Sequence, residues 1–297
     1  MIFPYTVRTL ASYHYLKSVQ LDKALLKAFS QTPVDFFLDS GAFSVVCKQR
    51  LGESVHISFN GYAAYITTYA PVISTYANLD VVTSEKKTWC NQQWMEQLNL
   101  KPLPVFHIGE SWEQLEMYIE RYPYIGLGIT LGGPRPSGHL QWLEQCFYRA
   151  AGRSVFHGFG ITSWAALTSF PWYSVDSSSW CEGFRYGRLP LFQEDRLVHI
   201  RLHDKRLPEQ YSPLFAQIGF DYLDFVDRGR TDRSKIIALS MLGYMQSEQW
   251  LRTRWGPITI PGQPERGTGL KIYLSDTQKD FAHIRCILPY LEERLKV

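Results

Sequence analysis

Short apolar runs that end in small or polar residues recur along this chain, and helix-like stretches separate them. The runs are Phe36–Leu38, Tyr76–Val81, Pro104–Phe106, Tyr124–Ile129, Val155–Phe156 and Tyr173–Val175. Between them, Tyr62–Tyr69, Glu110–Tyr122 and Leu140–Ala151 place apolar residues on one helical face. A strand followed by a helix, repeated in this way, predicts a parallel sheet with crossover helices.

At 297 residues, this pattern favours a (β/α)₈ barrel of the TIM type, with a doubly wound open sheet as the alternative. We expect one domain over residues 1–297, whose part from about 231 to 297 is a helical C-terminal extension. Beyond Asp176 the pattern loosens. The expected later elements are strands at Leu197–Leu202 and Tyr222–Val226, helices at Ser234–Arg252 and Phe281–Leu295, and a loop at Gly256–Gly269.

Composition excludes several classes of protein. An aromatic content of 15% is too high for a disordered chain. The five cysteines are odd in number, far apart and without a Cys-x-x-Cys pair, which excludes a disulfide framework and a cysteine-rich zinc subdomain. No signal peptide or membrane-length apolar segment is visible, so we expect a cytoplasmic protein with no membrane partner.

Charge and phosphate motifs restrict the ligands. The chain carries 31 Lys and Arg against 28 Asp and Glu, and the whole excess of +3 lies after residue 180. This is weak evidence for a polyanion-facing C-terminal part. Neither Gly-x-Gly-x-x-Gly after the first strand nor Gly-x-x-x-x-Gly-Lys is present, so no nucleotide cofactor is expected.

Reactive side chains gather at the predicted carboxyl ends of the strands, where barrels of this type carry their active sites. These positions hold Asp39, Ser40, Asp80, His107, Gly128, His157 and Asp176. A pair of carboxylates in one pocket is typical of glycosidic-bond chemistry, in which one attacks the anomeric carbon and the other transfers a proton. We expect Asp176 and Asp39 to form that pair, and no metal site.

Two motifs resemble those of the tRNA-guanine transglycosylase superfamily. Residues 37–43 read Phe-Leu-Asp-Ser-Gly-Ala-Phe, similar to the Asp-Ser-Gly-Gly-Phe motif of that family. Residues 174–180 read Ser-Val-Asp-Ser-Ser-Ser-Trp and stand where the family places its nucleophile, and Arg-Tyr-Gly-Arg follows at 185–188. The resemblance implies a (β/α)₈ barrel, with Asp39 as general acid and base and Asp176 as nucleophile.

Further landmarks occur in the family's order, so that the resemblance covers roughly residues 34–190. Residues 78–80, 105–109, 125–128 and 157–160 resemble the family's base-pocket segments, with a histidine in place of a glutamine at position 107. The resemblance implies a base pocket whose Asp80 recognises the guanine edge. The expected substrate-binding residues are Ser40, Asp80, His107, Gly126, Leu127, Gly128, His157 and Gly158.

Departures from the family pattern point to DNA. The Cys-x-Cys-x-x-Cys…His zinc site of the tRNA enzymes has no counterpart, and Ala42 replaces a glycine. The chain therefore looks more like the DNA-directed branch of bacteria and phages, which replaces guanine in DNA by a 7-deazaguanine base such as preQ0. Its target guanine would be flipped or single-stranded, with helper proteins possible for opening the duplex. Trp180 would stack on bases, and Arg185 and Arg188 would hold phosphates.

Three alternatives remain open at this stage. A related enzyme would act on tRNA instead of DNA. A barrel without catalytic activity would serve as a nucleic-acid docking subunit, although the presence of both Asp39 and Asp176 argues against it. A nucleoside hydrolase would release guanine without an incoming base.

Overall fold

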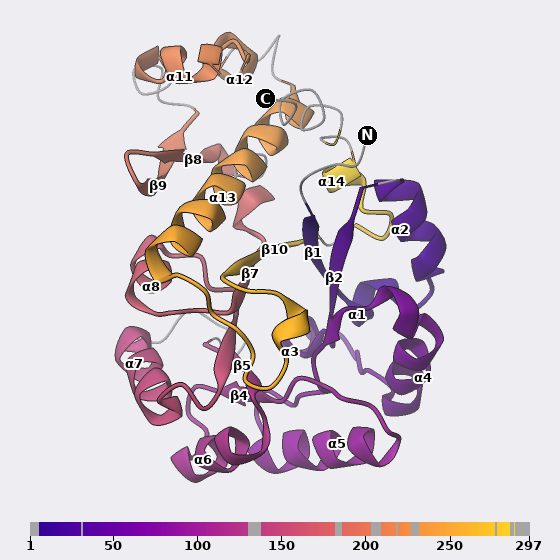
Figure 1. The fold of residues 1–297 in the computed structure, drawn as a ribbon. Coiled ribbons are helices and arrows are strands. Elements are labelled where there is room, and N and C mark those ends of the chain that lie inside the picture. The colour runs from indigo at the N-terminus through magenta and orange to yellow at the C-terminus, as the bar shows by residue number, and fades with distance from the viewer. Residues whose placement is uncertain are drawn as a thin grey trace.

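A curled parallel sheet forms the centre of the protein. The computed structural model describes residues 6–30, 32–129, 138–181, 186–202, 209–217, 219–226, 232–276, 278–285 and 288. Within these residues, eight strands form the sheet (Figure 1). Across the sheet they are β3 (Thr75–Tyr76), β2 (Val34–Asp39), β1 (Val7–Ser12), β10 (Lys271–Ser275), β7 (Ser174–Ser177), β6 (Val155–Phe159), β5 (Tyr124–Gly128) and β4 (Val105–His107). The predicted α/β class is confirmed.

The first and last strands in this order also approach each other. Ala77 and Leu103 form a parallel bridge just beyond β3 and just before β4. The Asn78 N–H donates to the Leu103 carbonyl at 2.9 Å, and the Leu103 N–H donates to the Tyr76 carbonyl at 2.8 Å. The two edges of the curled sheet are therefore hydrogen-bonded to one another at this point.

Helices surround the sheet. Their bounds are α1 (Tyr13–Leu16), α2 (Leu21–Phe29), α3 (Ala42–Arg50), α4 (Phe59–Tyr69), α5 (Glu85–Gln97), α6 (Trp112–Arg121), α7 (His139–Ala150) and α8 (Trp164–Ser169), with a 3₁₀ turn η1 (Ala70–Val72). In α6 the Ser111 hydroxyl caps the N-terminus by accepting from the Gln114 N–H, and Leu115, Tyr118 and Ile119 are buried. The three helices predicted before residue 152 are confirmed as α4, α6 and α7.

Successive residues along each strand face alternately toward two apolar layers, one beneath the helices and one inside the curl of the sheet. In β2, Phe36 and Leu38 belong to the layer beneath the helices, whereas Phe37 packs inside the curl of the sheet. Successive strand residues point to opposite faces, so Asp35 and Asp39 lie on the same inner face as Phe37. Both faces of the strand are buried, which explains why the sequence reads as a continuous apolar run.

The segment between β7 and β10 differs most from the sequence-based expectation. It contains η2 (Ser179–Cys181), β8 (Arg188–Gln193), β9 (Arg196–Arg201), α11 (Ser212–Gln217), α12 (Leu223–Val226), α13 (Arg233–Trp255) and η3 (Pro264–Arg266). Figure 1 shows β8, β9, α11 and α12 beside the long helix α13, away from β1 and β2. The predicted helix at Ser234–Arg252 and the loop at Gly256–Gly269, which holds only the turn η3, are confirmed.

Two predictions for the C-terminal part are wrong, and a third is confirmed in part. The strand expected at Leu197–Leu202 is present as β9, but it pairs antiparallel with β8 in a separate hairpin and does not join the parallel sheet. The hairpin turns at Glu194 and Asp195, whose positive φ angles of 49° and 58° suit a two-residue turn. The strand expected at Tyr222–Val226 is helix α12. Residues 231–297 are not a purely helical extension, because β10 lies between β1 and β7 in the sheet.

The closing helix begins as α14 (Ala282–Arg285), and most of the stretch predicted for it lies outside the described residues. Among the residues that the structure describes, no helix combines the length and the apolar composition needed to cross a membrane.

Buried Glu248 anchors α13 to the sheet. One carboxylate oxygen lies 2.7 Å from the Arg8 guanidinium of β1, and the other accepts from the Ile272 N–H of β10 at 2.8 Å. We expect Glu248→Ala to lower the free energy of unfolding by about 3–5 kcal/mol, because it removes the charge partner of Arg8 and the acceptor of a buried amide. Urea denaturation measures this loss. An equal loss in Glu265→Ala, on the exposed turn η3, would contradict the assignment.

Candidate active site

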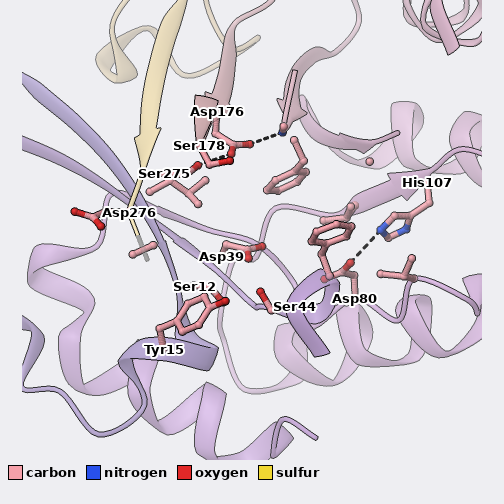
Figure 2. Close-up of a pocket in the computed structure, with 18 residues that line it drawn as sticks. Ser12, Tyr15, Asp39, Ser44, Asp80, His107, Asp176, Ser178, Ser275 and Asp276 are labelled. Carbon is pink, nitrogen blue, oxygen red and sulfur yellow. Dashed lines mark hydrogen bonds and ion pairs between the residues drawn. The ribbon is translucent and has the colours of Figure 1, made fainter. Parts of the chain in front are cut away.

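A cavity of about 400 Å³ opens at the carboxyl ends of the parallel strands (Figure 2). Its size falls within the range of small-molecule sites. It is lined by Leu10, Ala11, Ser12, Tyr15, Asp39, Phe43, Ser44, Asp80, Val82, Val105, His107, Gly128, Phe159, Gly160, Asp176, Ser178, Ser275 and Asp276. The parallel arrangement gathers these side chains, since every strand delivers its last residues to the same end of the sheet.

Asp39 ends β2 and begins a tight turn into α3. Its Oδ2 accepts from the Gly41 N–H at 3.0 Å. Gly41 has φ +92°, and a Cβ there would lie 2.3 Å from the Ser12 Oγ and 2.6 Å from the His14 Cβ, so that only glycine fits. Burial raises the pKa of Asp39 to about 8, and the nearby charges of Asp80 and Asp176 add to the effect. Asp39 therefore holds a proton at neutral pH.

Asp176, near the end of β7, is held by donors on both oxygens. Its Oδ1 accepts from the Gly160 N–H at 2.8 Å, and its Oδ2 accepts from the Ser275 hydroxyl at 2.5 Å. The His157 Nε2 lies 3.5 Å from Oδ1. These groups fix the direction of the carboxylate toward the cavity.

A chain of buried polar groups extends inward behind Asp176. The Nδ1 of His157 lies 2.6 Å from the Ser174 Oγ, which in turn lies 2.5 Å from the Tyr124 hydroxyl. Burial lowers the pKa of His157, against the opposing influence of Asp176, so the ring is neutral at pH 7. His157 does not line the cavity, and it lies behind the Asp176 carboxylate and the Phe159 ring, which both do.

The opposite wall carries a second polar group. Asp80 accepts from the Ser40 hydroxyl at 2.8 Å through Oδ1, and its Oδ2 lies 3.0 Å from the His107 Nε2. The His107 Nδ1 lies 3.3 Å from Glu110. Burial by itself lowers the pKa of His107, but the hydrogen bonds to Asp80 and Glu110 outweigh it and raise the pKa to about 9. His107 is therefore an imidazolium between two carboxylates.

Gly128 makes room for that imidazolium. A Cβ at this position would lie 2.6 Å from the His107 Cδ2. We expect Gly128→Ala to lower the free energy of unfolding by about 1–3 kcal/mol, because the added methyl group displaces a buried ring. Urea denaturation in the parent and in a His107→Ala background tests this expectation. The substitution should cost little once the ring is gone, and an equal cost in both backgrounds would refute the steric cause.

The structure brings together only some of the substrate-binding residues expected from sequence. Asp80, His107 and Gly128 line the cavity together with Asp39 and Asp176. Ser40 does not line it, but its hydroxyl donates a hydrogen bond to Asp80. Gly126 faces the interior below, where a Cβ would lie 2.5 Å from the Phe159 ring.

Leu127 and Gly158, also expected to bind substrate, face away from the cavity. The Leu127 side chain packs in the layer beneath the helices. A Cβ on Gly158 would meet Ile161 and Trp172 of that same layer. Strand parity directs both positions away from the cavity.

Of the three residues expected to contact nucleic acid, Trp180 needs correction. Trp180 is fully buried and donates its indole N–H to the Ser275 carbonyl at 3.0 Å. A buried indole has no free face for a base, so Trp180 is a packing residue. Arg188 is exposed at the start of β8, opposite Arg201. Arg185 lies outside the described residues.

Sequence reasoning missed Ser12, Glu110, Gly160 and Ser275. Ser12 and Ser275 end strands β1 and β10, which were not predicted. The alternation in Leu270–Leu274 was the available signal for β10. Glu110 follows His107 by three residues, but only the turn after β4 brings its carboxylate back to the ring.

No group of three or more His, Cys, Asp and Glu side chains in the described residues is arranged to hold a metal ion. No protein-family model matches the chain, and no curated protein matches its sequence. The function is therefore inferred from the cavity and from the motif resemblance.

Proposed function

We propose that this protein is a guanine transglycosylase that exchanges guanine in DNA for a 7-deazaguanine base by double displacement. One observation carries the proposal: two carboxyl groups of opposite character share a single cavity. Asp39 retains a proton because its pKa is raised to about 8, whereas Asp176 is held as a hydrogen-bond acceptor by Gly160 and Ser275. Carboxyl groups whose environments differ in this way divide into an acid and a nucleophile.

The first displacement breaks the bond between C1′ and N9 of the target nucleoside. A carboxylate oxygen of Asp176 attacks C1′ and forms an ester with the deoxyribose. The bonding electrons leave with guanine, and the proton on Asp39 passes to the departing base, so that neutral guanine is released and Asp39 becomes a carboxylate.

The second displacement reverses these roles. Asp39 removes the N9 proton of the incoming 7-deazaguanine, whose nitrogen attacks C1′ and releases the Asp176 carboxylate. Two inversions give net retention at C1′. The enzyme returns to its starting protonation state, so the reaction needs no cofactor.

Asp80 is the group we propose for base recognition. Its carboxylate lines the cavity and accepts hydrogen bonds, which suits the N1–H and 2-amino donors of guanine and disfavours adenine. Phe43, 46% exposed, also lines the cavity and offers an apolar surface for a planar base. The base must be flipped or single-stranded to enter.

We also propose that the curled sheet is a closed (β/α)₈ barrel. The bridge between Ala77 and Leu103 supports closure of β3 against β4. The strand order supports it too, because neighbours follow chain order all the way round once β10 is placed between β7 and β1.

DNA is preferred over tRNA on the basis of the motif resemblance, since the zinc motif of the tRNA enzymes is missing from the sequence. The decisive experiment incubates the protein with preQ0 and either DNA or tRNA, and measures the nucleosides by mass spectrometry. Incorporation into DNA is expected. Incorporation into tRNA alone would reject the DNA substrate, and release of guanine without incorporation would indicate a nucleoside hydrolase. No change to either nucleic acid would favour the docking-subunit alternative.

A further inference from the structure

Glu110, in the turn after β4, contacts both the backbone and the ring of His107. Its Oε2 accepts from the His107 backbone N–H at 2.9 Å, and its Oε1 lies 3.3 Å from the ring Nδ1. The Glu110 side chain is only 8% exposed. A carboxylate that is buried against one residue in this way fixes both the backbone and the ring of that residue.

His107 has no polar atom left for a ligand. Its Nε2 faces Asp80 at 3.0 Å, its Nδ1 faces Glu110, and Gly128 lies against the ring carbon. The pKa of about 9 means that both ring nitrogens carry protons at neutral pH. An imidazolium has no lone pair, and both of its N–H groups are already directed at carboxylates.

Asp80 is thereby oriented from two sides. The Ser40 hydroxyl donates to Oδ1 at 2.8 Å, and the His107 imidazolium approaches Oδ2. Figure 2 shows the contact between Asp80 and His107 at the edge of the cavity. The lone pairs of Asp80 that remain on the cavity side accept hydrogen bonds and cannot donate them.

We propose that Glu110 is a positioning residue that acts through His107 on Asp80, so that the base is read by the Asp80 carboxylate alone and His107 does not touch it. This inference rests on the proposed function, since it concerns the base-recognition side of that cavity. It further specifies the ligand class: purine-like bases that present two adjacent N–H donors on one edge.

Base selectivity follows from this arrangement. Guanine and 7-deazaguanine offer N1–H and the 2-amino group together, hypoxanthine lacks the amino donor, and adenine turns a lone pair at N1 toward the carboxylate. Loss of one hydrogen bond to a charged acceptor weakens binding by about 10- to 100-fold. We therefore expect hypoxanthine to bind about 10- to 100-fold more weakly than guanine, and adenine not to bind measurably.

Calorimetric titration with guanine and hypoxanthine tests the coupling. The protein is compared with Glu110→Gln, His107→Gln, the double variant, and Glu113→Gln as a matched control on the exposed face of α6. We expect Glu110→Gln to weaken guanine binding by about 10-fold and to reduce the preference for guanine over hypoxanthine. The double variant should bind no more weakly than His107→Gln, because Glu110 acts only through that ring.

Nitrogen NMR of the His107 ring supplies a readout that does not depend on catalysis. Glu110→Gln should move its titration to lower pH, whereas Glu113→Gln should leave it unchanged. Guanine affinity unchanged by Glu110→Gln, or additive effects in the double variant, would overturn the inference alone. No guanine binding by the unaltered protein would overturn both proposals. Binding as expected without base exchange would reject the transglycosylase activity while supporting the positioning role.

Discussion

Asp176→Asn is expected to abolish base exchange, with a loss of at least about 10³-fold. In the proposed mechanism, the substitution replaces the attacking carboxylate by an amide that cannot form the ester with C1′, while the side chain keeps nearly the same shape. The amide oxygen still has a donor available at Gly160 or Ser275, so the fold should be retained. Mass spectrometry of DNA nucleosides after incubation with a 7-deazaguanine base measures the loss.

A control carboxylate separates this effect from a change in charge. Asp280 lies on the surface, where its side chain is 52% exposed and pairs with Arg285. Asp280→Asn should exchange bases at the parent rate. A covalent adduct between DNA and protein should accumulate in the parent when the incoming base is withheld, and should be missing in Asp176→Asn. Undiminished exchange by Asp176→Asn would reject the assigned nucleophile.

Asp39→Asn is expected to reduce exchange by about 10²–10⁴-fold, the usual contribution of a positioned acid and base. The parent's kcat/KM should fall as pH rises through about 8, because Asp39 then loses the proton that the proposed mechanism passes to guanine. The slow residual reaction of the variant should lack this fall. A variant whose rate still declines around pH 8 would show that another group supplies the proton.

The same substitution has an opposite effect on stability. The folded pKa of Asp39 is raised above its ordinary value of 3.8, so folding binds its proton more tightly. The resulting stabilisation is complete below pH 4 and is lost as pH rises toward 8. Asp39→Asn should therefore gain stability relative to the parent across this range. At pH 8 a gain of about 1 kcal/mol or more, near 2–4 °C in Tm, is expected. Calorimetry at pH 4, 6 and 8 follows this divergence.

Much of the fold was predictable because strands buried on both faces leave continuous apolar runs. Runs such as Phe36–Leu38 and Val155–Phe156 fall within strands of the parallel sheet, and the polar residues after each run lie at one end of it. The missed strand β10 is as apolar as the others. The 93 residues 178–270 separate it from β7 along the chain, so local order gave no reason to place it between β7 and β1.

The residues of the candidate site were also predictable only in part. Asp39, Asp80, His107 and Asp176 were expected at strand ends, and all of them line one cavity. Leu127 and Trp180 were assigned to ligands on their position in a motif, but strand parity and burial turn both toward the core. A motif lists neighbours in the chain, whereas contact with a ligand depends on the direction of each side chain.

The sequence by itself determined the α/β class, the edge of the sheet that carries the polar residues, and the three carboxyl groups of Asp39, Asp80 and Asp176 that line the cavity there. These follow from local periodicity and from the rule that parallel strands present their ends together. Only the tertiary structure decided which carboxyl group holds a proton and what faces His107. Burial beside Asp80 and Asp176 raises the pKa of Asp39, and the hydrogen bonds to Asp80 and Glu110 outweigh burial and raise the pKa of His107 to about 9. Both effects depend on desolvation and on distances between residues far apart in the chain, which no local pattern encodes.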